Sequence, residues 1–99
     1  MNQLKLVASV SEKTALRYTP AGIPIVSGTL RHISKQKQAA VEREVDLEIF
    51  ALAAGDISQQ FQDLPLGSVT VFSGFLARKT RNSKSLVFHI IEIETNLLD

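Results

Sequence analysis

Apolar and polar residues alternate over most of the chain with a period of two, which is typical of β-strands that bury one face. A first strand is predicted around residues 4–11 and a second over about 25–33. The alternation is clearest over 42–51. Two further strands are predicted over 68–79 and 86–94, because both segments are rich in β-branched and aromatic residues. The pattern therefore predicts five strands.

The segments between these strands indicate turns and loops. Residues 19–24 read Thr-Pro-Ala-Gly-Ile-Pro, which fits a tight reversal of the chain. Residues 34–40 are polar and have no apolar period, so we expect a mobile loop there. Residues 81–84 have the composition of a hairpin turn between the last two strands.

One short helix is predicted between the third and fourth strands. Asp56 is a candidate N-cap, and Gln59 stands at the third position of the helix. Ile57, Phe61 and Leu64 follow at the helical spacing i, i+4, i+7 and would form its buried face.

The order of these elements predicts the fold class, an all-β fold with one short helix. Gly28 and Gly74 fall in the middle of long strands and indicate bulges or bends, which curve a sheet into a barrel. Five strands with a helix after the third describe an OB-fold barrel, whose open face binds oligonucleotides or oligosaccharides. A ferredoxin-like or SH3-like arrangement agrees less well with a single helix.

Length and composition indicate one ordinary globular domain over residues 1–99. The chain has 10.9 kDa, 44% hydrophobic and 21% charged residues. The absence of cysteine excludes disulfides and thiolate-based metal sites. Lys5 interrupts the N-terminal apolar run, so we expect no signal peptide and a cytoplasmic protein. So small a core would benefit from a partner subunit.

A formal net charge of only +1 gives no general reason to expect a polyanionic partner, but the cations are concentrated in two segments. One lies on the last hairpin and contains Arg78, Lys79, Arg81 and Lys84. The other follows the second strand and contains Arg31, Lys35 and Lys37. Both segments flank one groove in an OB barrel, so we predict that together they bind a phosphate backbone. For either segment alone, a merely solvated hairpin tip is an equal alternative.

Acidic residues occupy one side of the third strand at strict period two, and these are Glu42, Glu44, Asp46 and Glu48. Such a stripe repels phosphates. Glu44, Asp46 and Glu48 are therefore candidates for contact with a protein partner, although a solvated face is the simpler alternative. They could also meet Arg31 or Lys35 in exposed ion pairs, which contribute little.

Aromatic residues that could stack on bases are few, because the chain has no tryptophan. Tyr18 and Phe50 are the two candidates. The other four aromatic residues are assigned to the core, namely Phe61, Phe72, Phe75 and Phe88. Binding would then depend on backbone charge and fall steeply with salt.

Catalytic signals are weak. His32 and His89 lie in separate strands without a second ligand at metal spacing, and the carboxylates lie on a face expected to be solvated. We therefore expect a protein that is not an enzyme and that uses no metal or cofactor.

Several short segments, in their order and spacing over essentially the whole chain, resemble the primosomal replication protein N (PriB) family, dimeric relatives of bacterial single-stranded DNA-binding proteins. These segments are Leu-Lys-Leu-Val-Ala-Ser-Val at 4–10, Leu-Arg-Tyr-Thr-Pro-Ala-Gly-Ile-Pro at 16–24, Thr29-Leu30, Gly67-Ser68, Gly74-Phe75, Val87-Phe88-His89 and Ile93-Glu94.

The resemblance implies a non-enzymatic accessory factor of DNA replication restart. Such a protein binds single-stranded DNA, stimulates the PriA helicase at stalled forks and helps to recruit the next primosome loading factor, DnaT. It also implies a homodimer whose first strands pair at their edges. The family's basic positions correspond to Lys79, Arg81 and Lys84 in one loop, and to Arg31, Lys35 and Lys37 in the other.

Two departures from the family pattern shape the expectation. The family can carry an aromatic residue on the third strand where this chain has Val45 and Asp46, so we expect weak binding of single strands and a larger role for helicase contact. The chain stops at residues 96–99 without the long acidic-tipped tail of general single-strand binders. A short general single-strand binder and a protein adaptor with incidental basic loops remain the alternatives.

Overall fold

The computed structural model of the chain describes residues 1–94, and the expectation drawn from residues 96–99 lies outside that range. Its elements are, in order, β1 (Leu4–Lys13), β2 (Arg17–Tyr18), β3 (Pro24–Gln38), β4 (Val41–Ala54), α1 (Ile57–Asp63), β5 (Val69–Arg78) and β6 (Leu86–Glu94). All five predicted strands and the helix are present. The structure adds the strand β2, which was not predicted because two residues are too few to show an alternating pattern.

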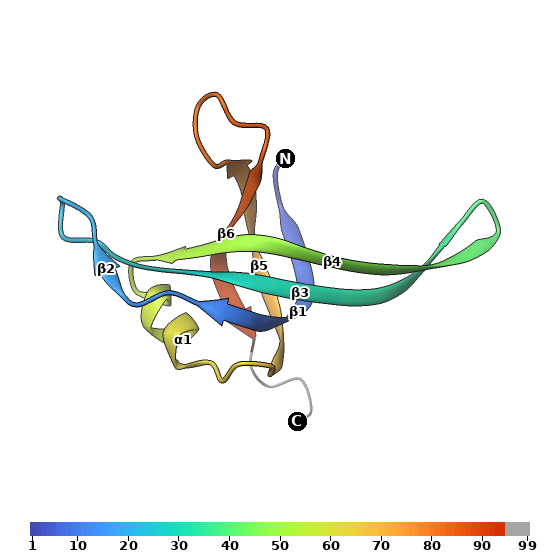
Figure 1. Ribbon diagram of the computed structural model, residues 1–99, viewed down its shortest axis with the longest axis horizontal. Helices are drawn as coiled ribbons and strands as arrows, with labels where there is room; N and C mark the ends of the chain where they lie inside the picture. The colour runs from blue at the N-terminus through green and yellow to red at the C-terminus, as the bar shows by residue number, and fades with distance from the viewer. Residues whose placement is uncertain (95–99) are drawn as a thin grey trace.

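The strands form one sheet that closes on itself. Their order is β1-β5-β6-β4-β3-β2, and a further pairing of β1 with β3 completes a five-stranded barrel. β4 and β6 run parallel, while the other pairs are antiparallel. The helix α1 connects β4 to β5 and covers one end of the barrel (Figure 1). This is the predicted OB-fold.

The core is built around three fully buried phenylalanines. Phe61 from the helix meets Phe72 from β5 edge to face, with ring centroids 6.2 Å apart, and Phe88 from β6 is equally buried. Truncating such a side chain to alanine typically costs ~3–5 kcal/mol of stability. The prediction for these three residues is confirmed. The prediction for Phe75 is wrong, because its side chain is 37% exposed on the outside of the barrel.

Gly28 and Gly74 permit close approaches between strands, as their mid-strand positions predict. A Cβ atom on Gly28 would lie 2.5 Å from the carbonyl oxygen of Glu12, where β1 is bulged. A Cβ atom on Gly74 would overlap the carbonyl oxygen of His89, and the register of β5 against β6 shifts between Ser73 and Gly74. Both bulges bend the sheet into the barrel.

The start of the helix differs from the prediction. Asp56 precedes α1, but its side chain makes no capping hydrogen bond. Instead the Ser58 hydroxyl donates to the carbonyl of Gly55 at 2.6 Å. At the other end, the Lys13 ammonium group donates to the carbonyls of Gln62 and Leu64 at 2.7 and 2.6 Å, and so satisfies groups that the helix leaves unpaired.

The mobile loop predicted over residues 34–40 is wrong. β3 continues to Gln38 and pairs with β4 in unbroken register, so that only Ala39 and Ala40 form the turn, with φ of 52° and 63°. This paired extension beyond the barrel, residues 34–45, is called the arm (Figure 1). Neither of its faces is covered by the barrel, so residues 34–38 of β3 need no apolar period and the pattern did not reveal them. The β4 half, from residue 42, lies in a predicted strand.

Candidate nucleic-acid interface

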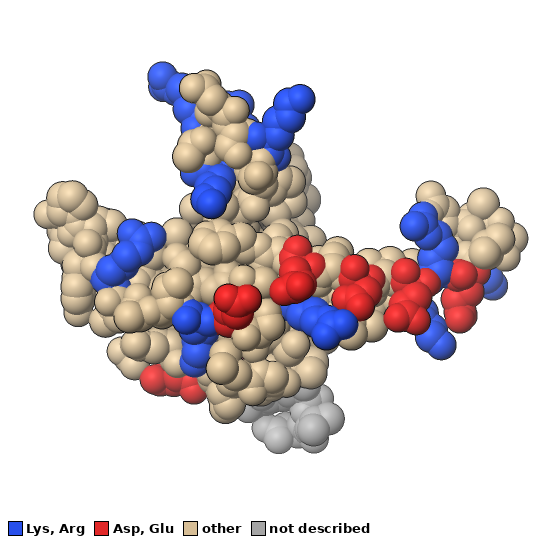
Figure 2. Space-filling view, viewed as in Figure 1, with Lys and Arg blue, Asp and Glu red and all other residues tan. Residues whose placement is uncertain are grey.

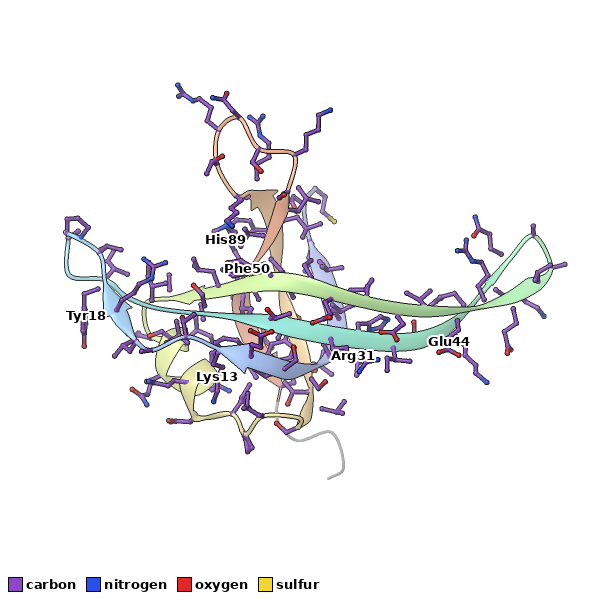
Figure 3. All side chains as sticks on the ribbon, viewed as in Figure 1. Lys13, Tyr18, Arg31, Glu44, Phe50 and His89 are labelled. Carbon is purple, nitrogen blue, oxygen red and sulfur yellow. The ribbon has the colours of Figure 1, made fainter. Side chains whose placement is uncertain are left out.

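A hollow of ≈ 360 Å³ lies on the outer face of the barrel at the base of the β5–β6 loop. Its size falls within the ~300–1,000 Å³ of small-molecule sites. Residues from five strands line it, namely Arg17, Ser27, Phe50, Leu52, Arg78, Lys79, Thr80, Val87 and His89. Figure 3 shows Phe50 and His89 below that loop, with Tyr18 at the far end of β2.

The register of the sheet explains why side chains distant in sequence meet here. Ser27 pairs with Leu52, Leu52 with His89 and His89 with Phe75, so one row crosses β3, β4, β6 and β5. Directly paired residues point to the same face of a sheet. Phe50 lies two residues before Leu52 on β4 and therefore faces the same way.

Two aromatic interactions shape this face. The Phe75 and His89 rings are stacked almost parallel, with centroids 4.8 Å apart and planes 2° apart. The Lys79 ammonium group lies 5.5 Å from the centroid of the Phe50 ring, within the range of a cation–π contact. The sequence had suggested Phe50 as a stacking residue, but not Phe75 or His89. The one feature of the sequence that pointed to this pair was Gly74, because the register of β5 against β6 shifts beside it and thereby pairs Phe75 with His89.

The cations at this site are free of carboxylates. Among the described residues that line the hollow, none is acidic. Likewise, within residues 1–94 no ion pair involves the predicted basic residues of this hairpin, which are Arg78, Lys79, Arg81 and Lys84. Figure 2 shows the blue side chains of this loop projecting from the top of the molecule. Arg17, which the sequence reasoning did not single out, adds a cation from β2.

The cations of the other basic segment lie opposite acids. Arg31, Lys35 and Lys37 of β3 pair in register with Glu48, Glu44 and Glu42 of β4, respectively. In Figure 2 the red side chains run in a row along the arm with blue ones beside them. The structure therefore does not gather the two basic segments around one hollow, contrary to the expectation.

The best-defined of these contacts is between Arg31 and Asp46. The guanidinium donates two hydrogen bonds to the carboxylate, at 3.2 and 3.0 Å. These hydrogen bonds lower the pKa of Asp46 and raise the pKa of Arg31. Lys35 lies 3.9 Å from Glu42. Because both pairs are exposed, they orient charges more than they stabilise the fold. The ion pairs anticipated for this stripe are thus present.

Tyr18 lies away from the hollow. Its neighbour Arg17 pairs with Ile25 and shares the outer face, so Tyr18 points to the opposite side of β2. There it is 65% exposed and borders a second hollow of ≈ 230 Å³ beside the helix, together with Asp56 and Gln59.

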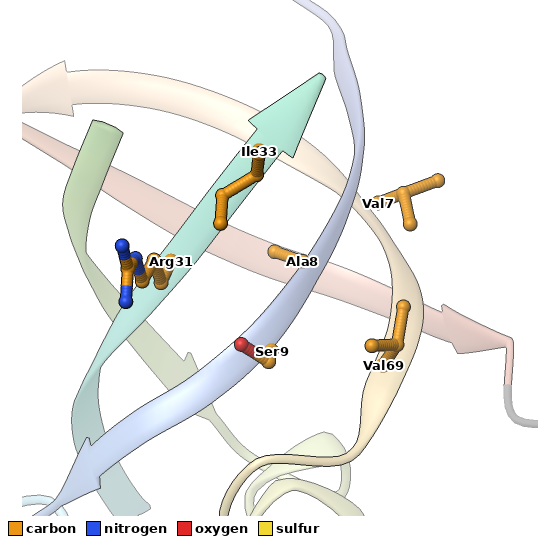
Figure 4. Close-up of a pocket in the computed structure, with 6 residues that line it drawn as sticks. All are labelled: Val7, Ala8, Ser9, Arg31, Ile33 and Val69. Carbon is orange, nitrogen blue, oxygen red and sulfur yellow. The ribbon is translucent and has the colours of Figure 1, made fainter. Parts of the chain in front are cut away.

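A third, smaller hollow of ≈ 130 Å³ lies between β1 and β3 (Figure 4). Val7, Ile33 and Val69 border it with 47%, 57% and 60% of their surface exposed. In the described part of the chain, Leu4 to Ala8 of β1 pair only with β5, so the other edge of this segment is not taken by a strand. The His32 ring donates a hydrogen bond to the carbonyl of Val7 at 2.6 Å on that side.

Within residues 1–94, no three His, Asp or Glu side chains are grouped so that they could hold a metal ion. None of the helices described here is long and apolar enough to cross a membrane.

Known proteins resemble this chain over nearly its whole length. Residues 2–92 match the model of a protein family whose description is "Another single-strand binding protein family". The replication restart protein PriB of Bordetella pertussis is 40% identical over 90 residues, which cover 91% of this chain and 84% of that protein. PriB of Nitrosomonas europaea is 33% identical over 89 residues, covering 90% and 82%.

Solved structures give the same picture. PriB from Ralstonia solanacearum superposes with a TM-score of 0.89 at 41% identity, covering 97% of this chain and 98% of that one. The SSB domain of a Synechococcus protein superposes with a TM-score of 0.74 at 20% identity, covering 96% of both chains. The second likeness concerns the fold alone.

Proposed function

The chain belongs to the single-strand binding protein family and to its PriB replication restart proteins, and we propose that it binds single-stranded DNA as an accessory factor of replication restart. One observation supports this most directly. Arg78 and Lys79 line a hollow that also contains Phe50 and His89, Arg81 and Lys84 extend from the β5–β6 loop next to it, and no described lining residue is acidic. Such a combination suits a phosphate backbone with splayed bases.

In this proposal, DNA crosses the outer face between β2 and the β5–β6 loop. Arg17 and Lys79 contact phosphates at the two sides of the hollow, and Phe50 presents its ring at the bottom. The cations predicted on β3, Arg31, Lys35 and Lys37, make a secondary contribution because acids face them. Tyr18 would be contacted only by DNA that continues around β2 to the side facing the helix. Affinity is modest and sensitive to salt, since charge supplies much of it.

The proposed assembly is a homodimer formed at β1. Leu4 to Ala8 present an edge that no strand of this chain covers, although His32 already bonds the Val7 carbonyl, and the exposed side chains of Val7, Ile33 and Val69 would be covered by a second copy. Pairing through an exposed strand edge is a general route to association. A chain of 99 residues also gains from the added buried surface.

The proposed protein partners are the PriA helicase, which the dimer stimulates at stalled forks, and the next loading factor, DnaT. The protein itself performs no catalysis in this scheme. Glu44 on the arm, and Asp46 and Glu48 next to it on β4, are the candidate contacts for a protein partner. Arg31 and Lys35 neutralise part of that stripe, and such a surface suits a partner with both kinds of charge.

Anisotropy titration of a labelled oligodeoxythymidylate at two salt concentrations tests the DNA-binding part. The triple reversal Lys79→Glu, Arg81→Glu and Lys84→Glu should abolish binding, whereas Arg43→Glu, a reversal outside the hollow, should not. Unchanged binding of the triple variant would disprove the site. Tight binding of the wild type that resists salt would favour a general single-strand binder instead.

An unwinding assay with PriA on a forked substrate tests the restart part. Wild-type protein should raise the unwinding rate and the triple variant should not. If the triple variant keeps stimulating PriA although it no longer binds DNA, the protein is an adaptor. In that case Glu44→Lys with Glu48→Lys should abolish stimulation.

A further inference from the structure

Beside the cations of the hollow, the stacked pair Phe75 and His89 has no assigned role, and we propose that His89 is a base-contacting residue held in position by Phe75. The inference rests on the proposed binding of single-stranded DNA at this hollow. It adds a second aromatic position to a site in which the ring of Phe50 is approached by Lys79.

The geometry gives His89 one covered face and one side turned to the hollow. Its ring lies flat on Phe75, with centroids 4.8 Å apart, and His89 also lines the hollow that holds Phe50 and Lys79. A ring supported from behind loses little further freedom when a base approaches it. Base stacking on such supported rings contributes more than stacking on a mobile side chain.

The backbone fixes this arrangement. An extra residue on β6, Ile91, shifts the register between Ser73 and Gly74, and from there Phe75 pairs directly with His89. A side chain at position 74 would overlap the His89 carbonyl oxygen, so the close approach of these strands requires glycine. The stacked pair therefore lies on two rigid barrel strands and not on the β5–β6 loop.

The position also separates His89 from the other aromatic residue of the hollow. The Phe50 ring is approached by the Lys79 ammonium group at 5.5 Å, so a base must share that face with a cation. Within residues 1–94, no cation–π contact of this kind involves Phe75 or His89. The part of the His89 ring that borders the hollow is thus an aromatic contact for a base that leaves the Lys79–Phe50 contact in place.

Two oligonucleotides separate stacking from charge. One is an oligodeoxythymidylate and the other has the same length and charge but carries abasic sites in place of its bases. Wild-type protein should bind the first more tightly. In His89→Ala this preference should fall by about tenfold, a typical value for one stacked base, while affinity for the abasic strand stays the same.

Variants and controls complete the design. His89→Phe should restore the preference, and Phe75→Ala should weaken it because the ring of His89 loses its support. Lys79→Ala should weaken the binding of both oligonucleotides by the same factor. Leu66→Ala, in the exposed connection outside the hollow, should change neither. Thermal unfolding of each variant in the absence of DNA verifies that the variant is folded.

The outcomes are distinct. Equal loss for both oligonucleotides in His89→Ala, without rescue by phenylalanine, would show that His89 only shapes the hollow and would overturn the inference. Absence of any preference for bases in the wild type would overturn it as well. Failure of the wild type to bind either strand would instead overturn the proposed function.

Discussion

The β3–β4 and β5–β6 hairpins both project from the barrel and both carry cations, yet their charges are arranged in different ways. In the arm and its base, Arg31 and Lys35 lie within 4 Å of the carboxylates of Asp46 and Glu42. In the β5–β6 hairpin, Lys79 meets an aromatic ring. A row of cations in a sequence is therefore not by itself a binding surface.

The difference comes from what each cation faces. In an antiparallel pair, each residue of one strand lies beside a fixed residue of the other, so the register from Arg31↔Glu48 to Lys37↔Glu42 brings opposite charges together. The β5–β6 loop spans residues 79–85 and is closed by the hydrogen bond from the Lys79 amide to the Ser85 carbonyl. Its cations extend into solvent, where a phosphate can replace water.

Removing the cations of each hairpin gives the largest expected contrast. Lys79→Ala, Arg81→Ala and Lys84→Ala together should weaken binding of single-stranded DNA by about 10- to 100-fold at low salt, and should reduce the salt slope by about 2, or ~0.7 per phosphate contact. Affinity for single-stranded DNA should fall only about threefold or less when the β3 cations are removed together by Arg31→Ala, Lys35→Ala and Lys37→Ala. Anisotropy titrations over a salt series measure both. Equal losses of DNA affinity in the two triple variants would show that the acids facing the β3 cations do not reduce the contribution of these cations to binding.

Neutralising the acids of the arm should sharpen the contrast from the other side. With Glu42→Gln, Glu44→Gln and Asp46→Asn, Lys35 and Lys37 no longer face carboxylates, and Arg31 keeps only Glu48 beside it. The formal charge of residues 31–48 then rises from zero to +3. Affinity for single-stranded DNA should rise about three- to tenfold, with a steeper salt slope. An unchanged affinity would mean that the arm lies outside the path of the DNA.

The turn of the arm offers a change of stability that leaves the charges untouched. Ala39 and Ala40 both have positive φ, which favours asparagine and glycine in a two-residue hairpin turn. Ala39→Asn with Ala40→Gly should stabilise the fold by about 1 kcal/mol, as measured by urea unfolding. DNA affinity should not change. A loss of stability would show that the turn has another conformation in solution.

Acidification should produce the smallest effect. Because Arg31 lowers the pKa of Asp46, their ion pair is complete above the ordinary aspartate value of 3.8 and is lost as the pH falls through the lower value of the folded protein. NMR titration of the side-chain carboxyl groups should show that Asp46 becomes protonated at a lower pH in the wild type than in Arg31→Ala. Identical titration curves would contradict the contact.

Much of the fold could be predicted from the sequence, and the exceptions have physical causes. Strands that bury one face show an apolar period, so the limits of the last strand, Leu86–Glu94, were predicted as they are found. The arm has no buried face, so its β3 half was predicted as a loop, although its β4 half lay in a predicted strand. Phe75 was assigned to the core because a period of two does not tell which face of an apolar strand is outside.

The candidate site was predictable only in part. The sequence identified the cations of the β5–β6 hairpin, because four basic residues stand close together there. It could not identify Arg17 or His89, each of which is a single residue without a local motif. Their place in the hollow follows from pairings between strands that are distant in the chain, such as Leu52 with His89.

By itself the sequence determined the number of barrel strands, the helix, the two mid-strand glycines at close approaches and the presence of basic and acidic segments, because these depend on local period, side-chain size and charge. Only the tertiary structure decided which cations are paired and which aromatic rings face the solvent. The reason is register: in a closed sheet, the neighbours of a side chain come from other strands, and a shift by one residue would reverse every face.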